Sequence, residues 1–250
     1  MFKPCAVIPV YNHPDTISDT VAAVLAQGLD IILVDDGSDT HCAEVLQQLS
    51  EQHNNTHLVT LPTNLGKGGA VKAGLIAAFN ASYTHALQID ADGQHNPQDI
   101  PVFLNAARDK PDTLISGLPR YDESVPKVRF YARYLTHVWI WINTLSLDIK
   151  DSMCGFRVYP LARAHALINR SHMGNRMDFD PEFMVRWHWA HPDIQHIETQ
   201  VDYPLDGVSH FRGLEDNWLI SKMHAKLFFG MLTQLPTRLF QRFRGESSNG

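Results

Sequence analysis

The chain has 250 residues, of which 44% are hydrophobic and 19% charged, and its formal net charge is −6. This is the composition of an ordinary globular protein that can bury a full core, which excludes disordered and collagen-like classes. The mild acidity disfavours a protein that coats nucleic acid. The three cysteines have no CxxC spacing, which suits free thiols in a reducing compartment such as the cytoplasm.

Short strand patterns alternate with helical patterns in the first half of the chain. Strands are expected at residues 5–10, 31–36, 57–61, 85–90 and 112–117. Helices are expected between them, at residues 15–28, 42–52, 67–81 and 97–108. This βαβα order predicts an α/β fold with a mainly parallel, Rossmann-like sheet flanked by helices. Ligands of such sheets bind beyond the carboxyl ends of the strands.

The second half of the chain is less regular. Helical patterns cover residues 126–147, 160–169, 180–190 and 214–243, and residues 197–203 alternate as a strand should. We therefore predict one α/β domain over residues 1–213 and a C-terminal amphipathic helical segment over residues 214–250. Because the chain begins directly with a strand pattern and holds no run of about 18 apolar residues, we expect neither a signal peptide nor a transmembrane helix.

Polar residues end three of the expected strands. Tyr11 and Asn12 follow the first strand, Asp36 ends the second, and Asp90 ends the fourth. Since Asp, Asn and Gly also form turns, turn chemistry explains any one of these positions. Three such strand ends at one edge of a sheet favour a ligand-binding site there.

Asp90 and Asp92 stand one residue apart in the segment DADGQH. In extended backbone their side chains share a face, and Gln94 or His95 can add a further ligand. Mg²⁺ and Mn²⁺ prefer such oxygen ligands and leave positions for phosphate and water. A metal at this position would neutralise charge that develops on a phosphate leaving group. A capped turn with solvated acids is the alternative interpretation.

The segment NLGKGGAVKAG, residues 64–74, follows one expected strand and opens a helix. It matches neither GxxxxGK[ST] nor GxGxxG, but its glycines permit a tight turn and the helix N-terminus offers free N–H groups. Lys67 can reach a phosphate from this position. Close packing of the helix on the sheet through small residues explains the glycines equally well.

Seven motifs in chain order resemble those of the family 2 glycosyltransferases, and most of all the dolichyl- or polyprenyl-phosphate sugar (mannosyl or glucosyl) synthases. They are PVYN, VDDGSDT, NLGKGGAVKAG, DADGQHNP, SGLPRY, DSMCGFRVYP and MDFDPEFMVRW, and they span about residues 3–213. The resemblance implies a GT-A fold, a nucleotide-sugar donor (a GDP- or UDP-sugar), a divalent metal (Mg²⁺ or Mn²⁺) and inversion at the anomeric carbon.

The resemblance also implies roles for individual residues. Asp92 and Gln94 should hold the metal, which in turn holds the diphosphate of the donor. The residues that we expect to bind the donor are Pro9, Tyr11, Asn12, Asp36, Lys67, Asp90 and Arg212. His13 departs from the family pattern, which often has an acid after the YN pair, so a nucleoside contact from that position is not carried over.

Three arginines are candidates for binding the acceptor. Arg120, in GLPRY, matches an arginine that such synthases direct at the acceptor phosphate. Arg129 and Arg133 lie four residues apart, so they share one face of the predicted helix and can complete an anion clamp. Surface ion pairing is the alternative for all three.

The C-terminal stretch departs from many relatives, which carry transmembrane helices there. Residues 222–244 combine five cations and no acid with an apolar face of Phe and Leu. A basic amphipathic helix of this kind can lie in a membrane interface. We expect peripheral contact with the cytoplasmic face of a membrane, and packing on the core or on a second copy is the alternative.

The expected reaction is a direct displacement at the anomeric carbon, with Asp92 and Arg120 among the catalytic candidates. A lipid-phosphate acceptor is already anionic and needs no strong base, whereas a hydroxyl acceptor does. Asp180 and Glu182 are the candidate bases, although acids at a helix N-terminus also act as caps. Residues 206–213, with His210 and Arg212, form either a loop that closes over the donor or a plain surface loop.

Two other classes share features with this sequence. A nucleotidyltransferase also has an α/β sheet with acids, but the glycine- and arginine-rich loop that follows its first strand is missing from this sequence. A non-catalytic module that binds nucleotide sugars remains an alternative to an enzyme.

Overall fold

The computed structural model describes residues 1–120, 127–201 and 213–246, with side chains throughout except at residues 127–133, 214 and 234–246. The strands are β1 (Pro4–Val10), β2 (Asp30–Asp35), β3 (Thr56–Thr60), β4 (His85–Gln88), β5 (Leu114–Arg120), β6 (Arg157–Pro160) and β7 (Ile194–Gln200). The helices are α1 (Pro14–Leu25), α2 (Thr40–Gln52), α3 (Lys67–Asn80), α4 (Ile100–Asp109), α5 (Lys127–Thr144), α6 (Leu161–Arg170), α7 (Phe179–Ala190) and α8 (Gly213–Glu246), and Pro97–Asp99 form a single 3₁₀ turn.

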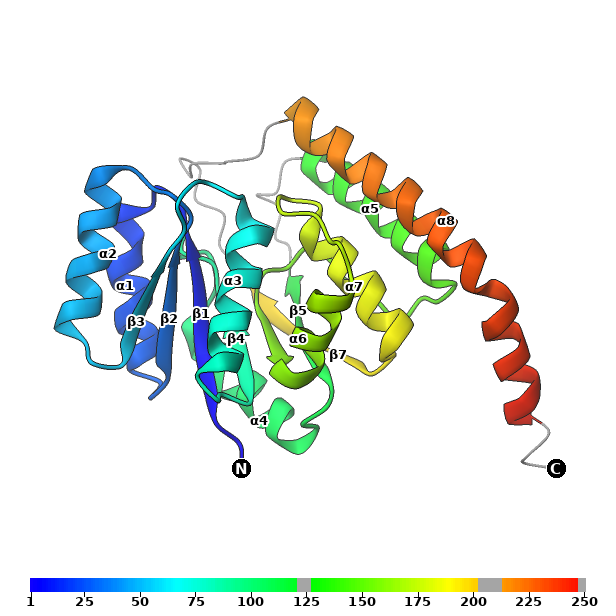
Figure 1. Ribbon diagram of the computed structural model, residues 1–250, viewed down its shortest axis with the longest axis horizontal. Helices are drawn as coiled ribbons and strands as arrows, with labels where there is room; N and C mark the ends of the chain where they lie inside the picture. Colours follow the sequence, from blue (N-terminus) through cyan, green and yellow to red (C-terminus); the bar gives the residue numbers. More distant parts are fainter. Residues whose placement is uncertain (121–126, 202–212, 247–250) are drawn as a thin grey trace.

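The strands form one seven-stranded sheet in the order β3-β2-β1-β4-β6-β5-β7 (Figure 1). β1 pairs in parallel with β2 and β4, β2 with β3, and β5 with β7. Only β6 among these strands runs the other way, antiparallel to β4 and β5. The predicted α/β class and mainly parallel sheet are therefore confirmed.

Strand β6 is the element that the sequence patterns missed. It has four residues, and all four are buried, so it shows no alternation of apolar and polar side chains. Periodicity cannot identify a short strand that is covered on both faces. The last strand was predicted at residues 197–203 but lies at Ile194–Gln200, because its bounds follow from pairing with β5 from Leu114 to Arg120.

Two apolar cores lie on the two faces of the sheet. Val7 of β1 faces the core that α3, α6, α7 and part of α8 cover, whereas Ile8 faces the core under α1, α2 and α4 (Figure 1). This division follows from the two-residue period of a strand. Burial of each aliphatic or aromatic side chain contributes about 1.5–3 kcal/mol to the free energy of folding. The two core layers therefore fix the strands, and with them the residues at the strand ends.

Helix α3 packs closely on the sheet through its glycines. A Cβ at Gly74 would lie 2.3 Å from Cγ1 of Val7, and one at Gly68 would lie 2.2 Å from Cβ of Phe179. The interpretation of close packing on the sheet is therefore confirmed at Gly74, whereas Gly68 packs against Phe179 of α7. The same packing sets the N-terminus of α3, and with it Lys67, at the carboxyl edge of the sheet.

Helix α8 lies beside α5, and its C-terminal part extends past the body of the molecule (Figure 1). Ile220, Met223 and Leu227, from its first half, belong to the core that also contains α7. This half of α8 therefore packs on the preceding domain. The division of the chain at residue 213 stays a prediction. Within the described ranges, no helix has both the length and the apolar character that crossing a membrane requires.

Candidate active site

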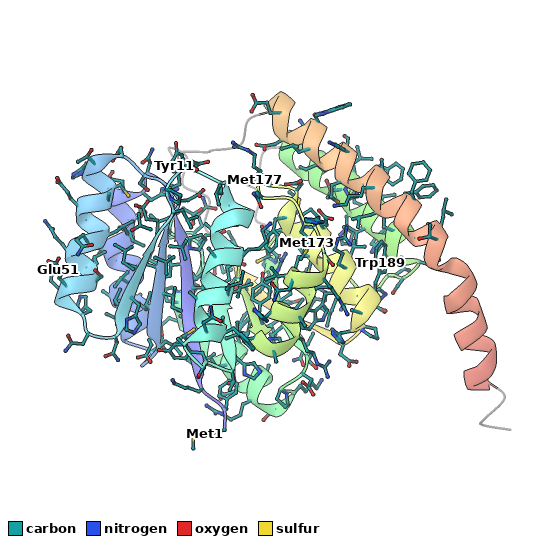
Figure 2. The ribbon with its side chains drawn as sticks, viewed as in Figure 1. Met1, Tyr11, Glu51, Met173, Met177 and Trp189 are labelled. Atoms are coloured by element: carbon teal, nitrogen blue, oxygen red, sulfur yellow. The ribbon has the colours of Figure 1, made fainter. Side chains whose placement is uncertain are left out.

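The ends of β1 and β2 bring the first group of predicted residues together. These strands pair as far as Val10 and Asp35, so the residues that follow them lie at one edge of the sheet. Asn12, with φ of 54°, links the two loops: its Oδ1 accepts from the Asp39 N–H at 2.8 Å, and its own N–H donates to Ser38 Oγ at 3.1 Å. Tyr11 lies beside this junction at the same edge (Figure 2).

Asp36 fastens the segment before α3 to the end of β2. Its carboxylate accepts hydrogen bonds from the backbone N–H groups of Leu65 (2.7 Å) and Gly66 (2.8 Å), and the side chain is buried. Burial raises the pKa of Asp36, against the lowering effect of these two hydrogen bonds. Asp36 thus holds the glycine-rich segment in the position from which α3 begins.

Lys67, the first residue of α3, faces the end of β4. Its Nζ lies 2.7 Å from Oδ2 of Asp90 and 3.6 Å from Oδ2 of Asp180. Burial lowers the pKa of Lys67, but the charges of Asp90 and Asp180 raise it more, so it lies above its ordinary value. The ammonium group is therefore charged and shared between two carboxylates.

The Asp90 carboxylate is enclosed on its other sides. Its Oδ1 is buried without a hydrogen-bond partner, and Nε2 of His95 lies 3.6 Å from its Oδ2. A Cβ at Gly155 would lie 2.4 Å from Oδ2, so only glycine leaves room for this side chain. Burial raises the pKa of Asp90, but Lys67 and His95 lower it by more than burial raises it. The net pKa is below the ordinary value, so the carboxylate is ionised.

Asp92 and Gln94 form a turn directly after Asp90. Oδ1 of Asp92 accepts the Gln94 backbone N–H at 3.1 Å, and Gly93 between them has φ of 73°. The alternative of a capped turn is therefore present in the structure. Burial and the neighbouring charge of Asp90 raise the pKa of Asp92. This repulsion, with the unpartnered oxygen of Asp90, is what a divalent cation would relieve.

A complete protein-made metal site is not present in the described ranges, where no group of three or more His, Cys, Asp and Glu side chains converges. Mg²⁺ is commonly held by only one or two carboxylates, together with substrate phosphates and water. Asp90 and Asp92 supply such a pair, and Gln94 an additional oxygen. The residues therefore fit a cation that arrives with a phosphate ligand.

The two candidate bases on α7 have different surroundings. Asp180 is buried in the same cluster as Lys67, and its Oδ1 lies 2.9 Å from Nη1 of Arg157. Glu182 is also buried but faces the opposite way, toward the loop before α7 and toward α8. Its carboxylate binds the Gly174 N–H (3.0 Å), Nε of Arg186 (2.8 Å) and Nζ of Lys226 (2.9 Å). Only Asp180 lies with the strand-end acids.

The predicted acceptor arginines are only partly described. Arg120 ends β5 as an exposed residue and forms an ion pair with Glu198 of β7, so its surface-pairing alternative is observed. Arg129 and Arg133 lie in the first part of α5, residues 127–133, whose side chains are not described. His210 and Arg212 lie outside the described residues. Because Arg120 is exposed and paired with Glu198, it does not belong to the Lys67–Asp90 cluster.

Arg157 is the site residue that the sequence patterns missed. It is fully buried on β6, and its Nη2 donates to the Ser152 carbonyl oxygen at 2.7 Å. Tyr159, two residues further along β6, donates a hydrogen bond to Oε1 of Gln88 on β4. Buried polar groups therefore link these two strands next to Arg157. The signal was a single charge inside the otherwise apolar run FRVYP, since arginine is almost never fully buried without a partner.

The fold identifies the class of protein to which the chain is similar. The mainly parallel seven-stranded sheet, with β6 inserted antiparallel and helices on both faces, matches the fold of solved glycosyltransferases of the GT-A type. The chain has a TM-score of 0.66 with glucosyl-3-phosphoglycerate synthase from Mycobacterium tuberculosis, at 16% identity over 92% of this chain and 80% of that one. It has a TM-score of 0.53 with the mannosyltransferase PcManGT from Pyrobaculum calidifontis, solved with GDP-Man and Mn²⁺, at 15% identity over 93% of this chain and 64% of that one.

The sequence profile of glycosyl transferase family 2 matches residues 5–173, and the chain belongs to this family. It is 27% identical over 199 residues to a dolichyl-phosphate beta-glucosyltransferase of Trichomonas vaginalis, which covers 72% of this chain and 59% of the relative. It is 32% identical over 183 residues to the undecaprenyl-phosphate 4-deoxy-4-formamido-L-arabinose transferase of Edwardsiella ictaluri, which covers 70% of this chain and 53% of the relative. The matched region thus spans little more than half of the length of these relatives.

Proposed function

We propose that this chain is an inverting, metal-dependent glycosyltransferase that moves a sugar from a nucleotide-sugar donor to a polyprenyl-phosphate-like lipid. The observation that carries the proposal is the convergence of Asp90 and Asp92 with Lys67 at the carboxyl edge of the sheet, where α3 begins. The names of the two family relatives, which both refer to polyprenyl phosphates, support the acceptor class.

Asp92, Asp90 and Gln94 would hold the cation. When bound, Mg²⁺ or Mn²⁺ supplies positive charge that stabilises the departing diphosphate. The Mn²⁺ and GDP-Man that are bound in one structural neighbour support the choice of ligands. Asp90 also binds Lys67, so the protein brings its own monovalent charge to the same place.

Residues around the strand ends would bind the rest of the donor. The nucleoside side of the site consists of Pro9, Tyr11, Asn12 and Asp36. The N-terminus of α3 and Lys67 would face the diphosphate, because free N–H groups and a fixed positive charge both favour phosphate. Arg212, in the segment proposed to close over the donor, would contact the same group.

In the displacement, an acceptor oxygen forms a bond to the anomeric carbon while the bond from that carbon to the diphosphate oxygen breaks. The electron pair of the broken bond leaves with the diphosphate. Both oxygens of Asp180 face cations, Nζ of Lys67 and Nη1 of Arg157, so this carboxylate is engaged in ion pairs and is not presented to an acceptor as a base. Its surroundings therefore favour an acceptor that is already anionic over a hydroxyl. Arg120, Arg129 and Arg133 are the proposed ligands of that anion.

A lipid acceptor requires access to a membrane, and the α5–α8 side of the molecule offers a surface for it. Large apolar side chains are exposed on these two helices at Tyr134, Leu135, Trp139, Trp218, Phe229 and Leu232. Exposed apolar patches of this kind, with aromatic residues and with cations such as Lys222 nearby, suit the interface of a membrane with anionic lipids. We infer peripheral contact, on the cytoplasmic face, through this surface.

A donor screen tests the proposal. Purified chain is incubated with GDP- and UDP-sugars, with Mg²⁺ or Mn²⁺, and with short polyprenyl phosphates, and mass spectrometry identifies the product. We expect a sugar–phosphate–lipid product that disappears in chelator and in Asp92→Ala. Product on a polyprenol instead of a polyprenyl phosphate would indicate a hydroxyl acceptor. Donor binding without turnover on any acceptor would indicate a non-catalytic module.

Membrane contact has a separate test. Sedimentation with vesicles of phosphatidylcholine and phosphatidylglycerol should retain the chain, and the double variant Trp218→Ser/Phe229→Ser should release it. Vesicles of phosphatidylcholine alone should bind it less, because the cations lose their partners. Equal recovery of both chains with both kinds of vesicle would contradict the inference.

A further inference from the structure

Lys67 occupies Oδ2 of Asp90, one of the two carboxylate oxygens that are available to a divalent cation. Its Nζ is 2.7 Å from Asp90 Oδ2, and the Asp90 side chain has only 20% of its surface exposed. Burying a carboxylate without a counter-ion is costly, so the ammonium group stabilises Asp90 when no ligand is bound. The same ammonium group would repel a second cation at the same oxygen.

A second acceptor for this ammonium group already lies nearby. Oδ2 of Asp180 is 3.6 Å from Nζ of Lys67, just beyond hydrogen-bonding distance. The other oxygen of Asp180 is occupied by Arg157 at 2.9 Å, which holds the carboxylate still and leaves Oδ2 free to accept. A lysine side chain can move between the two oxygens, because its stem is flexible and its charge is not tied to one geometry.

We propose that Lys67 is an exchangeable counter-ion, which neutralises Asp90 in the ligand-free chain and moves onto Asp180 when a divalent cation binds. From Asp180 the ammonium group then faces the diphosphate of the donor. This inference rests on the metal dependence of the proposed function. It assigns Lys67 a positioning role with two opposite effects on affinity. The lysine weakens binding of the cation alone and strengthens binding of the diphosphate.

The inference predicts opposite effects for two substitutions. Lys67→Met removes the competing charge, so Mn²⁺ alone should bind about tenfold more tightly or better. Asp180→Asn removes the charged acceptor to which Lys67 moves, so Mn²⁺ should bind several-fold more weakly. In the Lys67→Met background, Asp180→Asn should have little further effect, because no lysine remains to be moved. This non-additivity is the signature of coupling between the two sites.

Electron paramagnetic resonance titration of free Mn²⁺, with the full chain and without nucleotide, measures these affinities. Lys72→Met is the matched control: the same substitution on the same helix, at a lysine whose Nζ binds the carbonyl oxygens of Met173 and Gly174. It should change Mn²⁺ affinity less than twofold. Lys67→Arg keeps the charge and should not bind Mn²⁺ more tightly than the original chain does.

The outcomes separate the inference from the proposed function. If the original chain binds Mn²⁺ and Lys67→Met binds it equally or more weakly, the counter-ion role is wrong while the metal-dependent function stands. If no variant binds Mn²⁺ alone, the counter-ion role fails, whereas the metal-dependent function is decided separately by the loss of product in chelator in the donor screen. Should Lys67→Met not unfold cooperatively, Asp180→Asn alone decides the question, and unchanged or tighter Mn²⁺ binding by that variant would overturn the inference.

Discussion

The guanidinium group of Arg157 lies 2.9 Å from the carboxylate of Asp180, and both side chains are buried. The pair joins β6, the one antiparallel strand of the described sheet, to the start of α7. Removing one partner leaves the other charge buried without compensation. We therefore expect Arg157→Met to lower the free energy of unfolding by about 3–5 kcal/mol, measured by urea denaturation.

An exposed ion pair of the same chain serves as the control. Arg163 and Asp112 lie 3.1 Å apart at the surface, and Asp112 is 70% exposed. Arg163→Met should cost no more than about 1 kcal/mol, because solvent screens such pairs. Equal losses in the two variants would contradict the assignment of Arg157 as a buried structural charge.

Asp92 should lower stability while it supports activity. Burial and the charge of Asp90 raise its pKa, so its ionised form is disfavoured in the folded chain. Asp92→Asn removes this repulsion, and without metal we expect the Tm at pH 7 to rise by about 2–4 °C, which corresponds to about 1 kcal/mol. Sugar transfer should fall on the order of a hundredfold or more, as is common when one stabilising group of a transition state is removed.

Thermal unfolding with and without Mn²⁺ provides the second measurement for Asp92. The original chain should gain Tm as Mn²⁺ is added, since a ligand that binds only the folded state stabilises it. The Asp92→Asn variant should gain much less. A variant that melts lower than the original chain, with normal turnover, would show that this carboxylate is a turn cap alone.

Glu182 is expected to be a structural residue and Asp180 a functional one. Glu182→Gln weakens the link between the Gly174 N–H, Arg186 and Lys226, and should cost about 2 kcal/mol, or roughly 4–8 °C in Tm. Turnover below the melting range should stay within about threefold. Asp180→Asn should reduce turnover at least about tenfold, because it lies beside Lys67.

The partner on α8 gives the matching control for Glu182. Lys226→Met breaks the same link from the other side, at a lysine that is about half exposed. It should reproduce a smaller part of the loss in Tm, again without a loss of turnover. Glu182→Gln with an unchanged Tm and abolished turnover would instead identify Glu182 as the catalytic base.

His224 should make stability depend on pH at the α5–α8 contact. Burial lowers the pKa of this histidine from its ordinary 6.5 to about 4, and its Nδ1 lies 3.2 Å from Nδ2 of Asn143 on α5. The unfolded chain therefore binds a proton at a higher pH than the folded chain does. Stability should fall as pH decreases from about 6.5 to 4, by roughly 3 kcal/mol from this group, and level off below.

Urea denaturation at pH 7, 5.5 and 4.5 measures this slope. His224→Leu cannot titrate and should show a smaller loss of stability over the same range than the original chain. Other histidines, such as the partly buried His196, whose desolvation also lowers its pKa to about 4, contribute equally to both chains. If the free energy of unfolding falls equally with pH in both chains, His224 does not cause the pH dependence.

The order of strands and helices in the first half could be predicted from the sequence, and so could the edge of the sheet at which the polar strand ends of the candidate site meet. Hydrophobic periodicity is local, and parallel strands place their carboxyl ends together whatever surrounds them. Asn12, Asp36 and Asp90 therefore lie at one edge, as their positions after β1, β2 and β4 indicated. The roles of individual residues in binding donor, metal and acceptor stay predictions.

The direction of β6 and the positions of the two α7 acids could not be read in the same way. Four fully buried residues carry no periodicity, and Asp180 and Glu182 differ in sequence position by only two. On a helix this spacing points two side chains away from each other. One therefore joins the Lys67 cluster, and the other joins Arg186 and Lys226.

The sequence alone determined the class of fold, the edge of the sheet that carries the candidate site, and the acids that lie at that edge, because these depend on period and chain order. The tertiary structure decided which charges meet: it buried Arg157, gave Asp180 two cationic neighbours and set Lys67 against Asp90. Only folding could decide this, since the strength of an ion pair depends on how far remote segments exclude water from it.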